Sequence, residues 1–221
     1  MCDNRLWSQV VEALSGYDDY QCHFLSINQQ PNIAEILGDI QTQLPNEKVT
    51  LIGFSLGGYL ASAFAVQYPD FVEHLLVIAN YPAPLPAQEI RERTRIVAWI
   101  KRNGYNGIAL RRVLALLDKS AQQDKEIIQL IIDMDHALGE NVLTHQLLVT
   151  TMRENLVDAL RQLTISKHFC VGENDNLVSV ESLKKLSSDD EEFSLKVLNN
   201  TGHMVPLEQP KLLAQWINSI V

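Results

Sequence analysis

The sequence feature that most constrains the fold is a serine bracketed by glycines, Gly53-Phe54-Ser55-Leu56-Gly57-Gly58. The apolar, β-branched run Val49-Thr50-Leu51-Ile52 precedes it, and an alanine-rich helical pattern over residues 59–65 follows it. This order predicts the strand, sharp turn and helix that a G-x-S-x-G motif needs. The turn should hold Ser55 in strained backbone angles and expose its hydroxyl at the end of the strand.

The residues around Ser55 are predicted to have different structural and catalytic roles. A side chain at Gly53 or Gly57 should collide with the neighbouring strand or helix. Leu56 opens the predicted helix, so its backbone N–H has no intrahelical acceptor and can face an oxyanion that develops on a substrate carbonyl. Leu56 is therefore the candidate oxyanion-hole donor.

Charge and hydropathy exclude several classes of function. The chain has 221 residues, enough for one α/β domain or for such a domain with an insertion, and a net charge of −9. It has no long run of Lys and Arg, which argues against a nucleic-acid partner. No stretch reaches the roughly 20 apolar residues of a membrane span, and the first residues lack the pattern of a signal peptide. We expect a protein without a membrane partner.

Cysteine usage indicates a reducing compartment. Cys2, Cys22 and Cys170 are an odd number without metal-type spacing. Cys22 and Cys170 lie in strand-like apolar runs, where buried reduced thiols are usual. We therefore expect a cytoplasmic protein that needs no metal or other cofactor.

Strand and helix patterns alternate at both ends of the chain. Alternation at this spacing predicts an α/β protein, with a parallel sheet flanked by helices. The predicted helices cover residues 5–14, 33–44, 59–67, 180–186 and 207–221, and the predicted strands cover residues 20–27, 49–52, 75–79, 168–171 and 193–198.

The middle of the chain is predicted to be all helical. Residues 80–86 contain three prolines and read as a linker, because proline removes a backbone donor and fixes φ. Four amphipathic stripes follow, centred on residues 90–100, 108–117, 127–134 and 142–152. We expect a core domain formed by residues 1–85 and 160–221, with a helical cap over residues 86–159 inserted in it.

Two further polar signals fall where a predicted strand becomes a loop. Gly172-Glu173-Asn174-Asp175 follows one strand, and Asn200-Thr201-Gly202-His203 follows the next. The carboxyl ends of parallel strands lie along one sheet edge, so Ser55, Asp175 and His203 are expected to converge. The chain order Ser, Asp, His is that of an α/β-hydrolase triad.

Together these motifs, with Thr201-Gly202-His203-Met204 and the following Leu207-Glu208-Gln209-Pro210, resemble the α/β-hydrolase fold superfamily over essentially the whole chain. Cys2-Asp3-Asn4-Arg5-Leu6-Trp7 is similar to the segment after the first strand in small capped carboxylesterases, such as the methyl-ester esterases of biotin synthesis. The cap sequence carries little that identifies a substrate.

The resemblance implies a catalytic role for each member of the triad. Ser55 would be the nucleophile, His203 the general base and then acid, and Asp175 the carboxylate that orients the imidazole. Glu173, in the same loop, is the nearest rival for the acid. A second cluster, Asp133-Met134-Asp135-His136, could suggest a metal site, but adjacent helix positions face different ways, and a polar helix face is the better interpretation.

The chain departs from the family pattern at its start. Members of the family begin with a strand and a His-Gly-x or Pro-Gly-x loop before the segment that matches Cys2-Asp3, and that loop supplies the second oxyanion donor. This sequence begins after it. Either the true start lies upstream, or the chain folds with a shortened sheet that lacks the family's N-terminal strands. Such a sheet would have either a gap or a direct pairing between the strands predicted at residues 20–27 and 49–52.

The leading hypothesis is a serine hydrolase that cleaves a small carboxylic ester or thioester through an acyl-enzyme. One alternative keeps the triad for lyase or C–C bond chemistry. The other is a catalytically silent ligand-binding module on the same scaffold, because the oxyanion loop is absent. The sequence leaves acyl chain, leaving group and oligomeric state open.

Overall fold

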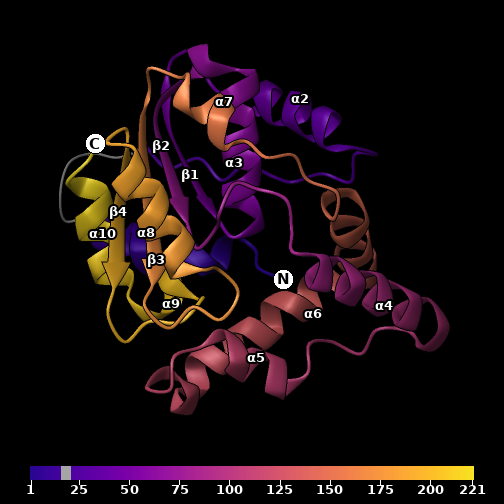
Figure 1. Cartoon of the computed structure of the whole chain (residues 1–221). Coiled ribbons are helices and arrows are strands. Elements are labelled where there is room, and N and C mark those ends of the chain that lie inside the picture. The colour runs from indigo at the N-terminus through magenta and orange to yellow at the C-terminus, as the bar shows by residue number, and fades with distance from the viewer. Residues whose placement is uncertain (16–20) are drawn as a thin grey trace.

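Four parallel strands form the centre of the molecule in the computed structural model, which describes residues 1–15 and 21–221 (Figure 1). Among these residues the strands lie side by side in chain order, β1-β2-β3-β4, and every neighbouring pair is parallel. Their bounds are β1 Val49–Phe54, β2 Val72–Ile78, β3 Ser166–Gly172 and β4 Phe193–Leu198. The predicted α/β fold with a parallel sheet is confirmed.

Helices cover both faces of this sheet, because the strand residues that point to one face and those that point to the other are both apolar. In β2, Leu75 and Val77 belong to the core beneath α2, α3, α7 and α8, whereas Leu76 and Ile78 belong to the core beneath α1 and α10. The helices of these layers are α1 Ser8–Leu14, α2 Ile33–Gln43, α3 Leu56–Gln67, α7 Val157–Arg161, α8 Val180–Asp189 and α10 Pro210–Asn218. Short 3₁₀ turns, Asn4–Trp7 and Pro69–Phe71, precede α1 and β2.

The segment between β2 and β3 is helical, as its four amphipathic stripes predict. It contains α4 Ala87–Asn103, α5 Leu110–Leu116, a 3₁₀ turn Ala121–Gln123, and α6 Lys125–Thr150, before α7. The third and fourth stripes lie on α6, which is kinked where Gly139 takes a φ of 72°. Helices α4, α5 and α6 lie to one side of the sheet, in the lower right of Figure 1.

The cap, defined here as α4 to α6, shares a small hydrophobic core with other parts of the chain. Val113, Leu117 and Met134 from the cap are buried together with Leu6 and Met204. Where the cap returns to the sheet, the Leu156 N–H donates to the Pro82 carbonyl at 3.0 Å. The division into domains at residues 86 and 159 remains a prediction.

The predicted strand over residues 20–27 is wrong for residues 21–27, which contain no strand; Tyr20 lies outside the described residues. The backbone of Ser26 is satisfied by a side chain instead. Its N–H donates to Gln43 Oε1 at 2.8 Å, and its carbonyl accepts from Gln43 Nε2 at 3.1 Å. Consequently this segment lies against α2 and does not pair with β1, and no strand precedes β1 within residues 1–15 and 21–48.

Two smaller predictions also need correction. The closing helix predicted over residues 207–221 is two helices, α9 Val205–Glu208 and α10, because Pro210 cannot donate the next helical hydrogen bond. Cys22 is exposed and not buried in a strand, whereas Cys170 is buried in β3 as predicted. Within the described part of the chain, no helix combines the length and apolar character that a membrane crossing requires.

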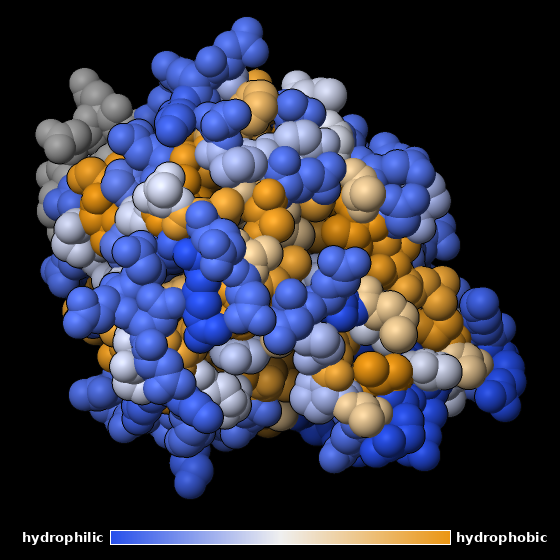
Figure 2. Space-filling model, turned by 45° about the horizontal axis from the view of Figure 1, so that its top comes forward, coloured by the Kyte–Doolittle hydropathy of each residue, from blue (hydrophilic) through white to orange (hydrophobic). Residues whose placement is uncertain are grey.

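Apolar and polar residues are interspersed on the face of the molecule shown in Figure 2. The cap and the residues directly after it contribute several of the exposed apolar side chains: Ile96, Trp99, Leu110, Leu148 and Met152. A groove of about 390 Å³ runs between α4 and α6 and has Leu148 and Met152 among its lining residues. None of the four predicted site residues lines it.

Candidate active site

Ser55 occupies a sharp turn between β1 and α3. Its N–H still donates to the Ile78 carbonyl at the end of β2, at 2.8 Å, so the turn is fixed to the sheet. Its φ of 52° and ψ of −114° lie outside the regions that L-residues ordinarily occupy. The strained turn predicted from the sequence is therefore present, and it holds the serine at the carboxyl end of β1.

Of the two glycine predictions around this turn, the one for Gly53 is confirmed and the one for Gly57 is wrong. A Cβ on Gly53 would lie 2.3 Å from the Gly57 carbonyl oxygen, so the expected collision is present there. A Cβ on Gly57 would meet nothing within 4 Å, and the prediction for that residue is wrong. The close approach falls instead at Gly58, where a Cβ would lie 2.9 Å from the Asn80 side chain. In the first turn of α3, Gly58 faces the sheet and Gly57 does not.

The structure brings the three predicted polar residues together at the carboxyl ends of the strands. His203 Nε2 lies 3.0 Å from Ser55 Oγ, and His203 Nδ1 lies 2.8 Å from Asp175 Oδ2. His203 is 4% exposed, and its imidazole packs against the ring of Phe54, with the ring centroids 5.2 Å apart. One histidine thus bridges a hydroxyl and a carboxylate that are 120 positions apart in the chain.

Asp175 is held in a fixed orientation by its own loop. Its side chain is fully enclosed, and Oδ1 accepts the N–H groups of Leu177 at 2.8 Å and Val178 at 3.0 Å. The other oxygen, Oδ2, is the one that faces His203. A Cβ on Gly172 would lie 2.1 Å from the Gly202 carbonyl oxygen, so the aspartate and histidine loops are in direct contact.

This arrangement fixes the tautomer of His203. An ionised carboxylate only accepts hydrogen bonds, so Nδ1 beside Asp175 must carry the proton. The opposite nitrogen, Nε2, is then a free acceptor that faces the hydroxyl of Ser55. This is the state in which an imidazole can remove a proton from serine.

The Leu56 N–H stands in the first turn of α3, immediately after Ser55. Backbone donors at this position have no intrahelical acceptor, and the positive end of the helix dipole lies there. The predicted oxyanion donor is thus adjacent to the serine.

The rival candidates lie outside this constellation. Glu173 is exposed, and its carboxylate accepts a hydrogen bond from the Asn200 N–H at 3.3 Å. Asp135 is buried, but it accepts from the Tyr105 hydroxyl and the Ile108 N–H within the cap. Among the residues that the structure describes, no group of three His, Cys, Asp or Glu side chains could hold a metal ion.

Two acidic residues near the site, the buried Asp118 and the half-buried Glu208, were not identified from the sequence. Glu208 and Asp118 are hydrogen-bonded to the loops that carry His203 and Asp175. Burial raises the pKa of Glu208, whereas hydrogen bonds from Ser120 lower the pKa of Asp118. Glu208 belongs to the motif after His203 that carries the resemblance, but residue pattern alone does not indicate that its carboxylate points inward.

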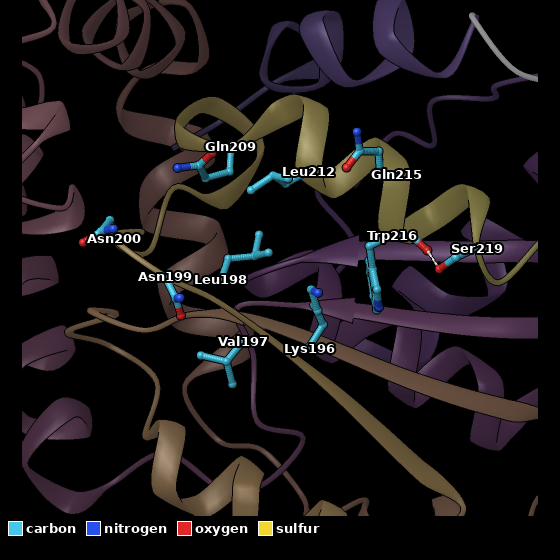
Figure 3. Close-up of a pocket in the computed structure, with 10 residues that line it drawn as sticks. All are labelled: Lys196, Val197, Leu198, Asn199, Asn200, Gln209, Leu212, Gln215, Trp216 and Ser219. Carbon is cyan, nitrogen blue, oxygen red and sulfur yellow. Dashed lines mark hydrogen bonds between the residues drawn. The ribbon is translucent and has the colours of Figure 1, made fainter.

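A separate groove of about 510 Å³ lies between β4 and α10 (Figure 3). Its lining includes Lys196, Leu198, Leu212 and Trp216, and the Ser219 hydroxyl donates to the Trp216 carbonyl at its rim. Neither Ser55, Leu56, Asp175 nor His203 is part of this lining.

A parallel α/β sheet with a serine at a strand-to-helix turn, facing a histidine and an aspartate, defines the class of hydrolase-type α/β enzymes. The chain belongs to the α/β hydrolase fold family, whose model matches residues 7–218.

Similar proteins of known name or structure agree with this membership. The pimeloyl-[acyl-carrier protein] methyl ester esterase of Vibrio campbellii is 24% identical, over 91% of this chain and 83% of its own length. A Bacillus subtilis protein provisionally assigned as 2-succinyl-6-hydroxy-2,4-cyclohexadiene-1-carboxylate synthase is 27% identical, over 84% of this chain and 70% of its own. A thermophilic esterase from Thermogutta terrifontis has a TM-score of 0.81 and 24% identity, over 99% of this chain and 85% of its own.

Proposed function

We propose that this protein is a serine hydrolase that cleaves a small carboxylic ester or thioester through an acyl-enzyme. The observation that carries the proposal is the chain of two contacts, 3.0 Å from Ser55 Oγ to His203 Nε2 and 2.8 Å from His203 Nδ1 to Asp175 Oδ2. In this proposal Ser55 is the nucleophile, His203 the general base and acid, and Asp175 the residue that orients the imidazole.

In the first half of the reaction, Ser55 Oγ attacks the carbonyl carbon while its proton passes to His203 Nε2. The carbonyl oxygen becomes negative and accepts a hydrogen bond from the Leu56 N–H. Asp175 stabilises the imidazolium that forms. The carbon–oxygen or carbon–sulfur bond then breaks, and His203 returns the proton to the departing alcohol or thiol.

In the second half, water takes the place of the leaving group. His203 Nε2 removes a proton from this water as it attacks the acyl-serine, and then returns the proton to Ser55 Oγ. The products are a carboxylic acid and the free enzyme. The backbone amides of Leu177 and Val178 keep Asp175 aligned throughout, because they hold the oxygen that does not face His203.

The names of the relatives support an ester as substrate. The Vibrio campbellii protein is named as a methyl ester esterase and the Thermogutta terrifontis protein as an esterase. The exposed apolar side chains of the cap are the surface that we propose for the acyl group, with cap movement closing it over Ser55. We further propose a cytoplasmic location, in keeping with three free cysteines.

Labelling with a fluorophosphonate tests this function. We expect time-dependent attachment of one probe, on the peptide that contains Ser55, and no attachment to Ser55→Ala. Turnover of a short-chain p-nitrophenyl ester should disappear in the same variant. A folded protein that remains unlabelled at high probe concentration would contradict the proposal. Ester turnover that survives in Ser55→Ala would place the activity elsewhere.

A second candidate function uses the same three residues for lyase or C–C bond chemistry, with Ser55 acting as a base. The similarity to the Bacillus subtilis synthase favours it. An acyl group found covalently on Ser55 after exposure to a simple ester would argue against this version. The silent binding module, the third possibility, is abandoned if wild type turns over an ester and Ser55→Ala does not.

A further inference from the structure

Glu208, on α9, joins the loop of His203 to the cap through one carboxylate oxygen. Its Oε2 accepts the Gly202 N–H at 3.0 Å and the Asp118 N–H at 2.7 Å. Gly202 directly precedes His203, and Asp118 follows α5. One side chain therefore links the cap to the backbone that carries the imidazole.

The two segments joined by Glu208 are also in direct contact. The His203 N–H donates to the Leu116 carbonyl at 2.8 Å. A Cβ on Gly202 would lie 2.5 Å from the Asp118 nitrogen, so only glycine permits this approach. The end of α5 thus lies against the histidine loop, and a displacement of the cap segment would move the backbone of His203.

The same network extends to the loop of Asp175. One oxygen of Asp118 accepts a hydrogen bond from Asn174 Nδ2 at 2.7 Å, and the other accepts from the backbone and hydroxyl of Ser120. The Asn174 N–H donates to the Thr201 carbonyl at 2.9 Å. Cap, histidine loop and aspartate loop are consequently cross-linked within a few residues of the triad.

Glu208 is half-buried as a residue, but enclosing its carboxylate is costly for a structural contact alone. Desolvation raises its pKa, and its second oxygen, Oε1, is buried without a hydrogen-bond partner among the described residues. A carboxylate in this environment adds little net stability, because the cost of desolvation offsets much of what its hydrogen bonds contribute. Its larger effect is on geometry, since two backbone amides must remain where that oxygen can accept both.

We propose that Glu208 is a positioning residue for the reaction. It does not touch the reacting atoms; it holds the Gly202–His203 backbone against the Leu116–Asp118 segment of the cap, so that Nε2 of His203 stays within reach of Ser55. This inference rests on the proposed function, and it adds that the Glu208 carboxylate helps to couple the position of the cap to the alignment of the triad.

The first test compares three substitutions of Glu208 by steady-state hydrolysis of p-nitrophenyl acetate, a small ester that needs little from the cap. Glu208→Ala should lower kcat about 10²-fold with KM changed less than about threefold, since a displacement near 1 Å has effects of that size. Glu208→Asp should lose about tenfold, because its shorter carboxylate cannot reach both amides. Glu208→Gln should stay within about fivefold, because its amide oxygen still accepts.

Glu140→Ala is the matched control. Glu140 also accepts a backbone N–H within the cap, from Tyr105 at 3.0 Å, but it touches neither catalytic loop. Its kcat should equal that of wild type. A loss in Glu140→Ala as large as in Glu208→Ala would mean that any weakening of the cap lowers activity, and it would overturn the specific role of Glu208.

A spectroscopic readout separates this inference from the proposed function. The proton shared by His203 Nδ1 and Asp175 should give a downfield ¹H resonance that is present in wild type and Glu208→Gln, and absent or shifted in Glu208→Ala and Glu208→Asp. This signal does not depend on turnover, so it tests Glu208 even if Ser55→Ala shows that the esterase proposal is wrong. If Glu208→Ala does not fold, the resonance and kcat of Glu208→Asp are the test. An unchanged resonance together with kcat within twofold of wild type would overturn the inference.

Discussion

Replacement of Asp175 by Asn should remove most activity with little effect on folding, because the structure dictates how the new amide must lie. The Leu177 and Val178 N–H groups both point at Oδ1. In the variant the amide oxygen has to occupy that place, since an NH₂ group there would face two donors. The NH₂ group is then left opposite His203 Nδ1 and donates to it.

The loss can be bounded from these contacts. With a donor opposite Nδ1, the imidazole carries its proton on Nε2 and cannot accept the proton of Ser55, an error that costs about 10⁴-fold in kcat, or about 5.4 kcal/mol. A flipped amide would restore the correct tautomer but turn its NH₂ group toward the Leu177 and Val178 N–H groups, and so lose two hydrogen bonds at about 1 kcal/mol each. The flipped form is therefore populated at no more than about 3%, and the expected loss lies between about 30-fold and 10⁴-fold.

Hydrolysis of p-nitrophenyl acetate measures this loss, and a urea titration followed by circular dichroism checks folding. The control is Glu173→Gln, the same chemical change at the exposed neighbour in the same loop, which should alter kcat less than about twofold. If Asp175→Asn keeps more than about a tenth of wild-type kcat, the orientation argument and the role of Asp175 are both wrong.

Three further predictions concern stability and reactivity. Gly53→Ala should destabilise the protein by about 3 kcal/mol or more in urea titrations, since its Cβ would meet the Gly57 carbonyl at 2.3 Å. Gly57→Ala should be neutral or stabilising by up to about 1 kcal/mol. Equal effects of the two substitutions would refute this explanation of the packing. An alkylating reagent should modify the exposed Cys22 in the native protein long before Cys170, because burial raises the pKa of the Cys170 thiol to about 12, and mass spectrometry of the peptides would reveal the opposite order. Burial raises the pKa of Glu208 above its ordinary 4.5, so the folded state binds this proton more tightly than the unfolded state does. The free energy of unfolding should therefore fall as the pH rises through the window above 4.5. In Glu208→Gln the free energy of unfolding should fall less over the same window.

The parts of the fold that the sequence predicts well are those governed by local pattern. The run before Ser55, the helix after it and the strands that end at Gly172 and Leu198 follow from apolar periodicity bounded by glycine or polar residues. The convergence of the triad follows from parallel strands sharing one edge, and the structure brings Ser55, Asp175 and His203 within hydrogen-bonding distance.

The errors arise where tertiary contacts decide. Residues 21–27 have a strand-like composition, but the side chain of Gln43 satisfies the backbone of Ser26 and a strand partner is not used. Which glycine of the elbow faces the sheet depends on the rotation of α3, which the spacing of glycines alone does not determine. The Glu208 carboxylate contacts a cap segment some 90 residues earlier in the chain, and a local sequence pattern does not predict that contact.

Mass spectrometry of the intact protein during reaction with a p-nitrophenyl ester detects whether Ser55 forms a covalent acyl intermediate. We expect a transient mass increase equal to one acyl group, located on the peptide that contains Ser55 and absent in Ser55→Ala. Folded protein that releases p-nitrophenol with no acyl group on Ser55 at any time, or that carries the group on another residue, would contradict this expectation.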